Sequence, residues 1–304
     1  MTFIHSFLQF QSEKTEESKG RTGFWASDLE SCRRALAYSF QTTKQSNPPS
    51  VQNELMFETG KQIEVSIVAR FMEMRATYQP SEIVGDHIRE DGGDSQVTYD
   101  ESIGQFRIGF LYEGVPFSGK PDAIISDEGQ KAVVEVKTFY GPYYERELKN
   151  NKPKTSHCLQ LAFYLFALGL PKGYLFNMDR GSGQMYFNTM NHIGDLVYKC
   201  GDTIVELELA LSRLHQCYGE IQSGLPDPDY KYKYDTNLLH SYLKDKTISK
   251  TKIVDAARGH SVVGDWQCKY CSFKDRCLQD NGISLGYTEE EMVSVKELSK
   301  ILQK

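Results

Sequence analysis

The stretch Lys131–Thr138, "KAVVEVKT", decides the fold of this 304-residue chain. Four of its residues are apolar and mostly β-branched, which predicts a buried strand. Glu135 and Lys137 lie inside it, and residues two apart on a strand point to the same face. An acid and a base therefore share one face of an otherwise apolar strand.

The preceding segment supplies a partner for this strand. "KPDAIIS", Lys120–Ser126, and the turn sequence "DEGQ" predict a β-hairpin that brings Asp122 opposite Glu135 and Lys137. Two facing carboxylates repel each other unless a cation lies between them, and hard oxygen ligands suit Mg²⁺ or Mn²⁺. A nearby lysine can neutralise developing charge or help to deprotonate a water. The other interpretation is a surface hairpin with alternating polar residues.

The composition narrows the class of protein. With 39% hydrophobic and 25% charged residues, the chain is typical of a soluble globular protein, and we expect it to be cytoplasmic. No apolar run approaches the roughly 18–20 residues of a membrane span, and no signal-peptide pattern is recognised. The net charge of -6 argues against a protein that coats nucleic acid, but not against an enzyme acting on it. The odd count of seven cysteines argues against a disulfide framework.

The order of elements predicts an α/β core, a mixed β-sheet flanked by helices. We expect a flexible arm over 1–22 and a helix that follows Ser27 as its N-cap and carries Cys32. The remaining expected elements are a helix over 51–76, short strands over 80–120, a helix over 155–170, a second strand pair over 173–190, a long helix over 193–224 and a helical C-terminal tail over 281–304.

The hairpin pattern resembles the PD-(D/E)xK nuclease superfamily. It stands here as Pro121-Asp122 followed by Glu135-Val136-Lys137. The resemblance implies a restriction-endonuclease-like core. It also implies that Asp122, Glu135 and Val136 belong to the metal site and that Asp122, Glu135 and Lys137 are catalytic.

A second element lies on the helix after the motif strand. In "QLAFY", Gln160 and Tyr164 are four residues apart and share one helix face. This resembles the Gln-xxx-Tyr element of the RecB-like branch of the superfamily, which contacts nucleic acid near the active site. The resemblance implies catalytic and nucleic-acid-binding roles for both residues. The alternative is that Tyr164 only fills the core.

A third element lies upstream. "GKQIE", Gly60–Glu64, matches the position of the RecB-like Gly-xxx-His motif, with glutamate in place of histidine. An ionisable group in the middle of an apolar helix face is costly unless it is paired or bound to metal. We therefore expect Glu64 to be a third acidic metal ligand. A salt bridge with Arg75 is the alternative.

The cysteines give the last element. "CKYCSFKDRC" places Cys268, Cys271 and Cys277 close together, and Cys32 lies far upstream. This set resembles the iron–sulfur members of the RecB-like group, which include CRISPR-associated exonucleases and the AddB nuclease, and it implies a [4Fe–4S] cluster that joins the N- and C-terminal segments. A four-cysteine zinc site is the alternative. Arg33 could contact phosphate near the cluster.

The resemblance implies one nuclease domain over 23–280, with Cys32 and 268–277 forming a cluster subdomain. Cys158, Cys200 and Cys217 are expected in helices as buried small hydrophobic residues.

The expected function is that of a metal-dependent deoxyribonuclease, an exonuclease acting on single-stranded DNA ends in repair, recombination, phage DNA processing or CRISPR adaptation. Lysines and tyrosines alternate over 230–252 and could follow a single strand, or they could belong to a solvated loop. Two other interpretations stay open. One is a non-catalytic nucleic-acid-binding or assembly module with the same fold. The other is a protein of different function that is stabilised by a zinc site. A homo-oligomer or further protein partners are possible, and a membrane partner is not expected.

Overall fold

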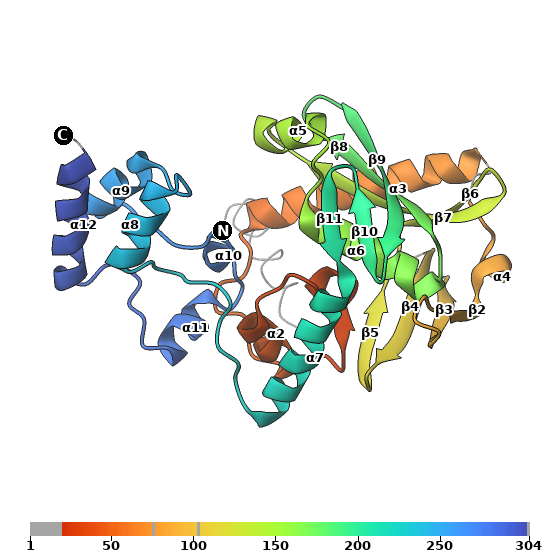
Figure 1. The fold of residues 1–304 in the computed structure, drawn as a ribbon, viewed down its shortest axis with the longest axis horizontal. Coiled ribbons are helices and arrows are strands. Elements are labelled where there is room, and N and C mark those ends of the chain that lie inside the picture. Colours follow the sequence, from red (N-terminus) through yellow and green to blue (C-terminus); the bar gives the residue numbers. More distant parts are fainter. Residues whose placement is uncertain (1–19, 75–76, 102–103, 303–304) are drawn as a thin grey trace, which may run out of the picture. The chain divides into compact units, whose positions relative to one another are not determined.

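The computed structural model describes residues 20–74, 77–101 and 104–302 (Figure 1). The chain divides into two compact units, which are considered separately. The sheet unit comprises Arg21–Ser31 and Gln52–Gly224. The helical unit comprises, among the described residues, Gly20, Cys32–Val51 and 225–302. Nearly all of the expected flexible arm lies outside the described residues. The expected 23–280 nuclease domain includes parts of both units and stays a prediction.

Two mixed sheets form among the described residues of the sheet unit. In each of them a single pair of strands is parallel, β1 with β5 in one and β7 with β8 in the other. The first sheet has the order β1 (Phe24–Trp25), β5 (Val115–Gly119), β4 (Gln105–Tyr112), β3 (Asp94–Asp100), β2 (Gly85–Ile88). The second has the order β11 (Thr203–Glu206), β10 (Val197–Cys200), β9 (Met185–Gly194), β8 (Lys172–Asp179), β7 (Gln130–Phe139), β6 (Ala123–Asp127).

The expected hairpin is present as β6 and β7. Glu128 and Gly129 make its turn, with φ of 50° and 82°, the positive values that a tight two-residue turn requires. Ala123 pairs with Val134 in the antiparallel register. Val136 is fully buried. The prediction of a buried strand over 131–138 is confirmed.

The helices of the sheet unit differ in burial. The sequence reaches the parallel strand β8 from β7 through α5 (Pro142–Lys149) and α6 (Thr155–Leu168). Helix α6 contacts strands of both sheets and is apolar on nearly all sides, as a central helix must be. The other helical elements are η1 (Ala26–Asp28), α3 (Val51–Glu73), α4 (Pro80–Ile83) and α7 (Leu207–Ser223).

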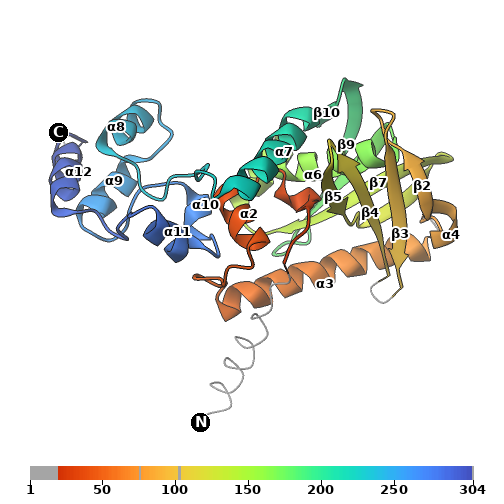
Figure 2. The same cartoon turned by 90° about the horizontal axis from the view of Figure 1, so that it is seen from below.

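Helix α3 runs along one side of the sheet unit (Figure 2). Its only buried residue among those described is Gly60. A Cβ atom at this position would lie 2.8 Å from Oγ1 of Thr138, so glycine permits the close approach of α3 to β7. Further along the helix, Ile67, Val68 and Phe71 pack on the apolar cluster around Val136.

Two of the expected helices are wrong in extent. The segment 193–224 is not one helix, because Val197–Cys200 and Thr203–Glu206 form the antiparallel strands β10 and β11, joined through Gly201 at φ 58°. Only α7 is helical there, and Cys200 is a strand residue. The helix expected after Ser27 begins instead at Arg33, because the carboxylate of Asp28 accepts the Trp25 N–H at 2.8 Å and closes a short 3₁₀ turn.

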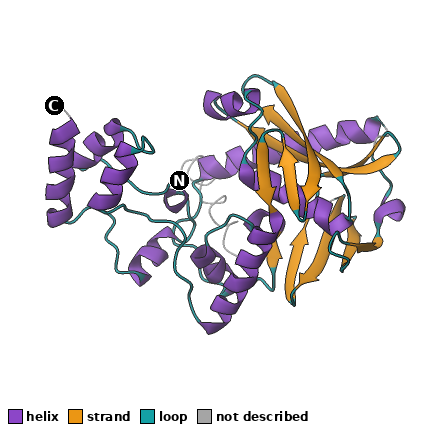
Figure 3. Ribbon diagram, viewed as in Figure 1, coloured by secondary structure: helices purple, strands orange, loops and turns teal. Residues whose placement is uncertain are grey.

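The helical unit contains helices and loops among its described residues (Figure 3). Its helices are α2 (Arg33–Phe40), α8 (Thr236–Lys244), α9 (Lys250–Ala257), α10 (Trp266–Lys269), α11 (Lys274–Asp280) and α12 (Glu289–Leu302). Buried residues of α8, α9 and α12, among them Leu239, Ile253 and Leu298, form one small core. Helix α12 covers Glu289–Leu302 of the expected tail over 281–304, and the tail as a separate part of the chain stays a prediction. Among all described residues, no helix has the length and apolarity needed to cross a bilayer.

Candidate active site

The hairpin brings three of the expected site residues together. Glu135 is 1% exposed, and its Oε1 lies 2.5 Å from the Nζ of Lys137 on the same face of β7. Asp122 directly precedes β6, and its Oδ2 accepts the N–H of Val136 at 2.7 Å. The buried valines of β7 thus fix one acid and one base, and a backbone N–H of the same strand fixes the second acid.

This group of charges is strained electrostatically. Burial, together with the neighbouring Asp122 carboxylate, raises the pKa of Glu135 to about 8, against the opposing effect of Lys137. Burial opposes the charge of Lys137, but Glu135 and Asp122 outweigh it and raise the pKa of the ammonium. The Oε2 of Glu135 is buried and has no hydrogen-bond partner in the described part of the chain. A buried carboxylate with one unpaired oxygen is a position where a further cation would be stabilising.

Glu64 joins the group from helix α3. It is half-buried, and burial followed by the charge of Asp122 raises its pKa, while Lys137, Lys61 and Arg180 lower it. Glu64 is therefore close enough to interact electrostatically with both Asp122 and Lys137. The described residues show no ion pair for Glu64, and Arg75, its alternative partner, lies outside them.

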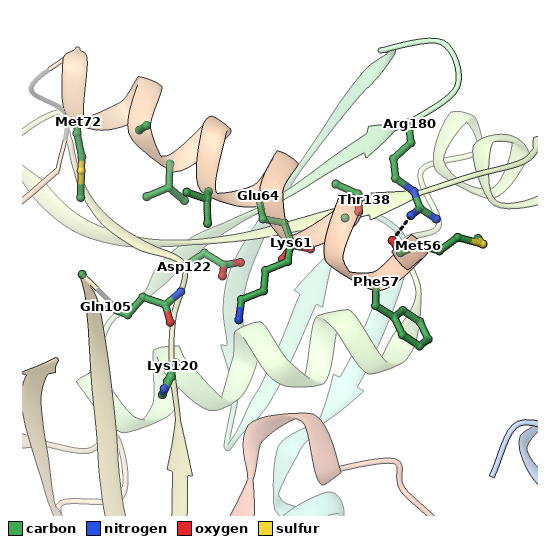
Figure 4. A pocket seen from close by; sticks show the side chains of 15 residues that line it. Met56, Phe57, Lys61, Glu64, Met72, Gln105, Lys120, Asp122, Thr138 and Arg180 are labelled. Atoms are coloured by element: carbon green, nitrogen blue, oxygen red, sulfur yellow. Dashed lines mark hydrogen bonds between the residues drawn. The ribbon is translucent and has the colours of Figure 1, made fainter. Parts of the chain in front are cut away.

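The side chains surround a cleft of about 610 Å³ (Figure 4). Glu64 and Lys61 extend from α3 toward Asp122, and Lys120 lies nearby on the chain leading to Asp122. Glu135 is buried next to Asp122 and is not part of the wall. The lining comprises Met56, Phe57, Gly60, Lys61, Glu64, Val65, Val68, Ala69, Met72, Gly104, Gln105, Lys120, Asp122, Thr138 and Arg180.

The oxygen donors of this site suit a hard divalent cation. Glu135 offers an unpaired buried oxygen, and Asp122 and Glu64 offer carboxylates on the cleft wall. The described residues nevertheless contain no group of three or more His, Cys, Asp or Glu side chains already gathered as metal ligands. The ammonium of Lys137 holds the other oxygen of Glu135 instead. Val136 contributes its N–H to Asp122.

Gln160 and Tyr164 interact with each other and with the chain next to Asp122. Gln160 Nε2 donates to the Tyr164 hydroxyl at 3.1 Å, and that hydroxyl donates to the carbonyl of Lys120 at 3.0 Å. Tyr164 is 1% exposed. Its hydroxyl is therefore used inside the protein, where it anchors the segment that carries Asp122.

Other side chains near the site belong to no recognised motif. The Tyr144 hydroxyl lies 3.2 Å from Nδ1 of His157 and 3.2 Å from Oδ1 of Asn177. Arg180 donates to the carbonyl of Met56 at 2.7 Å, and its Nε is buried without a partner among the described residues. These contacts join elements distant in sequence, so no local pattern identifies them. Lys61 is the exception among the residues near the site. It lies about one helical turn before Glu64, so the sequence alone could place it on the same helix face.

The four expected cluster cysteines lie within the helical unit. Burial, followed by the nearby Cys32 thiol, raises the pKa of Cys268 to about 12. Burial also raises the pKa of Cys271 and that of Cys277, and the Cys32 thiol adds to both shifts. No three of them are gathered as metal ligands in the described residues.

The segments that carry these cysteines pack together. Asn47 Nδ2 donates to the carbonyl of Cys271 at 2.9 Å, and the Tyr38 hydroxyl donates to Asp280 at 2.7 Å. Arg33, expected at phosphate, binds Asp229 through its backbone N–H at 2.6 Å and its Nε at 2.8 Å. An N-terminal and a C-terminal segment therefore meet at the cysteines, as four thiolate ligands of one site would require.

Several solved structures resemble this fold at low identity. The crystal structure of SSO0001 is 14% identical, with 91% of this chain and 96% of that chain covered and a TM-score of 0.42. An alkaline exonuclease from Laribacter hongkongensis is 16% identical, with 74% and 93% covered and a TM-score of 0.33. Its complex with dAMP is 14% identical, with the same coverage and a TM-score of 0.34.

The sequence itself gives the more specific result. No curated protein matches the chain. The profile of the PD-(D/E)XK nuclease superfamily, however, matches residues 3–278, nearly the whole chain, and the expected motif residues lie within this range. The protein belongs to the PD-(D/E)XK nuclease superfamily.

Proposed function

We propose that this protein is a metal-dependent nuclease that hydrolyses phosphodiester bonds of DNA. The observation that carries the proposal is the state of Glu135, buried with one oxygen on Lys137 and the other unpaired, beside the carboxylate of Asp122. A protein that only bound nucleic acid would gain nothing from placing these charges in an apolar sheet, where they are costly. Membership of a nuclease superfamily supports the same function.

Each residue has a distinct proposed role. Asp122, Glu135 and Glu64 would hold Mg²⁺ or Mn²⁺, with Val136 fixing Asp122 through its N–H. The bound cation would stabilise charge on the phosphate and make water more acidic. Lys137 positions the attacking water and stabilises the negative charge that develops. Gln160 and Tyr164 support Asp122 through the Lys120 carbonyl.

The test is cleavage of end-labelled DNA with Mg²⁺, with Mn²⁺ or with a chelator. We expect wild type to cut only with metal, and Lys137→Ala to be slower by about 10²- to 10⁴-fold, the usual contribution of a group that positions a proton-transfer step. Lys131→Ala is the matched control, because Lys131 lies at the start of the same strand and donates to the carbonyl of Glu82. Wild type that cuts with neither metal, or Lys137→Ala that cuts as fast as Lys131→Ala, would contradict the proposal.

We further propose that the enzyme is an exonuclease that starts at single-stranded ends. The order of motifs, which resembles the RecB-like exonuclease branch, supports this. A covalently closed single-stranded circle should resist the enzyme, whereas the same circle cut once should be degraded from its ends. Equal degradation of both would make the enzyme an endonuclease.

We also propose that Cys32, Cys268, Cys271 and Cys277 bind a [4Fe–4S] cluster. Their convergence from two chain segments in the helical unit supports four-thiolate ligation. The protein purified without oxygen should be brown, with iron and acid-labile sulfide in equal amounts, and Cys268→Ser should lose the colour. A colourless protein containing one zinc would instead indicate the zinc site that the same ligands can form.

A further inference from the structure

Helix α3 lines the cleft with four exposed, large apolar side chains as well as with Lys61 and Glu64. Phe57 is 68% exposed, Val65 52%, Met72 50% and Met56 44%, and all four line the cleft. Large apolar side chains on a surface are ordinary when scattered singly, but four of them lining one cleft indicate a partner. We call these four residues the apolar stripe.

Basic groups border the apolar stripe. Lys61 lies on α3 itself, Lys120 precedes Asp122, and Arg180 approaches from the end of β8. Within the described part of the chain, neither Lys61 nor Lys120 has a hydrogen bond or ion pair from its side chain. The cleft thus offers free cations next to exposed apolar surface, with Asp122 and Glu64 on the same wall.

This combination fits one class of ligand. A single strand of nucleic acid carries phosphates that bind cations and bases whose faces stack on apolar or aromatic side chains. A duplex turns its bases toward each other and would offer this wall mainly phosphate and sugar. The charges and the apolar stripe together are complementary to an unpaired strand.

Phe57 is the residue best placed to stack on a base. Phe57, Lys61 and Glu64 are separated by four and three residues, so they share one face of α3, and Figure 4 shows Phe57 and Lys61 extending from the same side of the helix. Phe57 lies about 10 Å along the helix from Glu64, at 1.5 Å per residue. An aromatic ring at that distance can hold a base while the adjoining backbone reaches the carboxylates.

We propose that Phe57 stacks on a base of an unpaired strand bound in the cleft, and that the apolar stripe makes the site prefer single-stranded over duplex DNA. This inference rests on the proposed nuclease function, because it takes the strand bound in the cleft as the substrate. It assigns to Phe57 a role in specificity that is separate from the chemistry at Glu135 and Lys137.

The test is binding rather than cleavage. Fluorescence anisotropy with Mg²⁺, in the Lys137→Ala background, would compare a labelled single-stranded oligonucleotide with a blunt duplex of the same length. Phe57→Ala should weaken single-strand binding by about 5- to 100-fold, the usual effect of losing one base–aromatic stack, and change duplex binding little. Phe57→Trp should keep the affinity. Leu55→Ala, an exposed α3 residue that does not line the cleft, is the matched control.

A second arm identifies the stacked base. Abasic sites placed one at a time along the oligonucleotide should show one position whose loss weakens the Phe57 protein and does not weaken Phe57→Ala further. Equal binding by Phe57→Ala and Leu55→Ala, or no binding of either DNA, would overturn the inference. A lower melting temperature of Phe57→Ala without DNA would also overturn it, because the stripe would then be covered by another part of this chain.

The outcomes separate the inference from the proposed function. Wild type that cleaves DNA with no dependence of binding on Phe57 leaves the nuclease proposal standing and removes this one. Single-strand binding that depends on Phe57, in a protein that cleaves nothing, removes the nuclease proposal and keeps the stacking role of Phe57 for a bound strand that is not a substrate.

Discussion

The carboxylate site of the sheet unit and the cysteines of the helical unit are built in opposite ways. Glu135 and Lys137 stand on a ten-residue strand whose valines are buried, so packing holds the charges in place. Cys268 and Cys277 stand on helices of four and seven residues, and their side chains are partly exposed. A short helix with little buried surface has little stability of its own. The first site is ordered by its fold, and the second would gain its order from the metal group proposed for it.

The largest expected effect is therefore on the helical unit when its thiols can no longer bind the proposed metal group. Cys268→Ser should make 32–51 and 266–281 sensitive to protease while the sheet unit stays resistant, since four-thiolate metal binding contributes on the order of 10 kcal/mol to folding in small metal-dependent domains. Limited proteolysis with mass spectrometry reads both units at once. Cys217→Ala in α7 is the control for thiol loss elsewhere. Unchanged cleavage of 266–281 in Cys268→Ser would remove the contrast between the two sites.

Within the sheet unit, the close contact of α3 with β7 should be sensitive to a single methyl group. Gly60→Ala brings a Cβ to 2.8 Å from Thr138 Oγ1, and such overpacking typically costs about 1–3 kcal/mol. We expect a lower unfolding free energy in urea and weaker catalysis, because Glu64 shifts with the helix.

Two variants make this prediction specific. Thr138→Ala in the Gly60→Ala background should recover much of the loss by removing the clashing oxygen. Gly219→Ala on α7, where a Cβ meets no atom within 4 Å, should be neutral or slightly stabilising. If Gly60→Ala behaves like Gly219→Ala, the contact is looser than the structure indicates.

A smaller effect is expected from the hydrogen bond behind Asp122. Tyr164→Phe leaves the Lys120 carbonyl without its donor, a loss of about 1–2 kcal/mol when the group is buried. Cleavage should slow while single-strand binding changes little, because Phe57 and Lys61 are untouched. Tyr186→Phe, which removes a hydroxyl from Glu145, is the control and should keep full activity. A Tyr164→Phe enzyme with the wild-type rate would show that the Lys120 carbonyl does not hold Asp122.

The smallest effect at neutral pH concerns His157. Burial, followed by Lys137 and Lys154, lowers its pKa to about 3 from the usual 6.5. The unfolded chain therefore takes up a proton below pH 6.5 that the folded protein does not, so the unfolding free energy falls as the pH decreases from 6.5 toward 3. His157→Gln should remove on the order of 1 kcal/mol of this loss between pH 6.5 and 5.5, measured by urea unfolding. A His157→Gln protein with the same slope as wild type would contradict the assignment.

The elements of the fold that the sequence predicts correctly are those whose pattern lies within their own residues. The strand Lys131–Thr138 and the helix at 155–168 carry their signal in their own residues, and both predictions are confirmed. Superfamily membership is confirmed as well. Strands β10 and β11 were missed because a short two-strand segment next to α7 also fits a helical pattern, and the pairing of β10 with β9 decides its state.

The residues of the candidate site also differ in whether a local sequence pattern can predict their positions. Asp122, Glu135 and Lys137 meet through the register of one hairpin, which a sequence can specify. The bond from Tyr164 to the Lys120 carbonyl and the position of Arg180 depend on how α6 and β8 pack, which no local pattern specifies. The RecB-like branch and the iron–sulfur cluster stay predictions.

The turn at Glu128–Gly129 has a consequence for the length of the chain. Because strand side chains alternate between faces, one residue inserted or deleted within β7, between its turn and Glu135, would carry Glu135 and Lys137 to the face opposite Asp122 if the pairing near the turn is kept. Two residues added as one further strand pair would restore the alternation. The length of the strand between the turn and Glu135 is therefore as much a part of the site as the charged residues themselves.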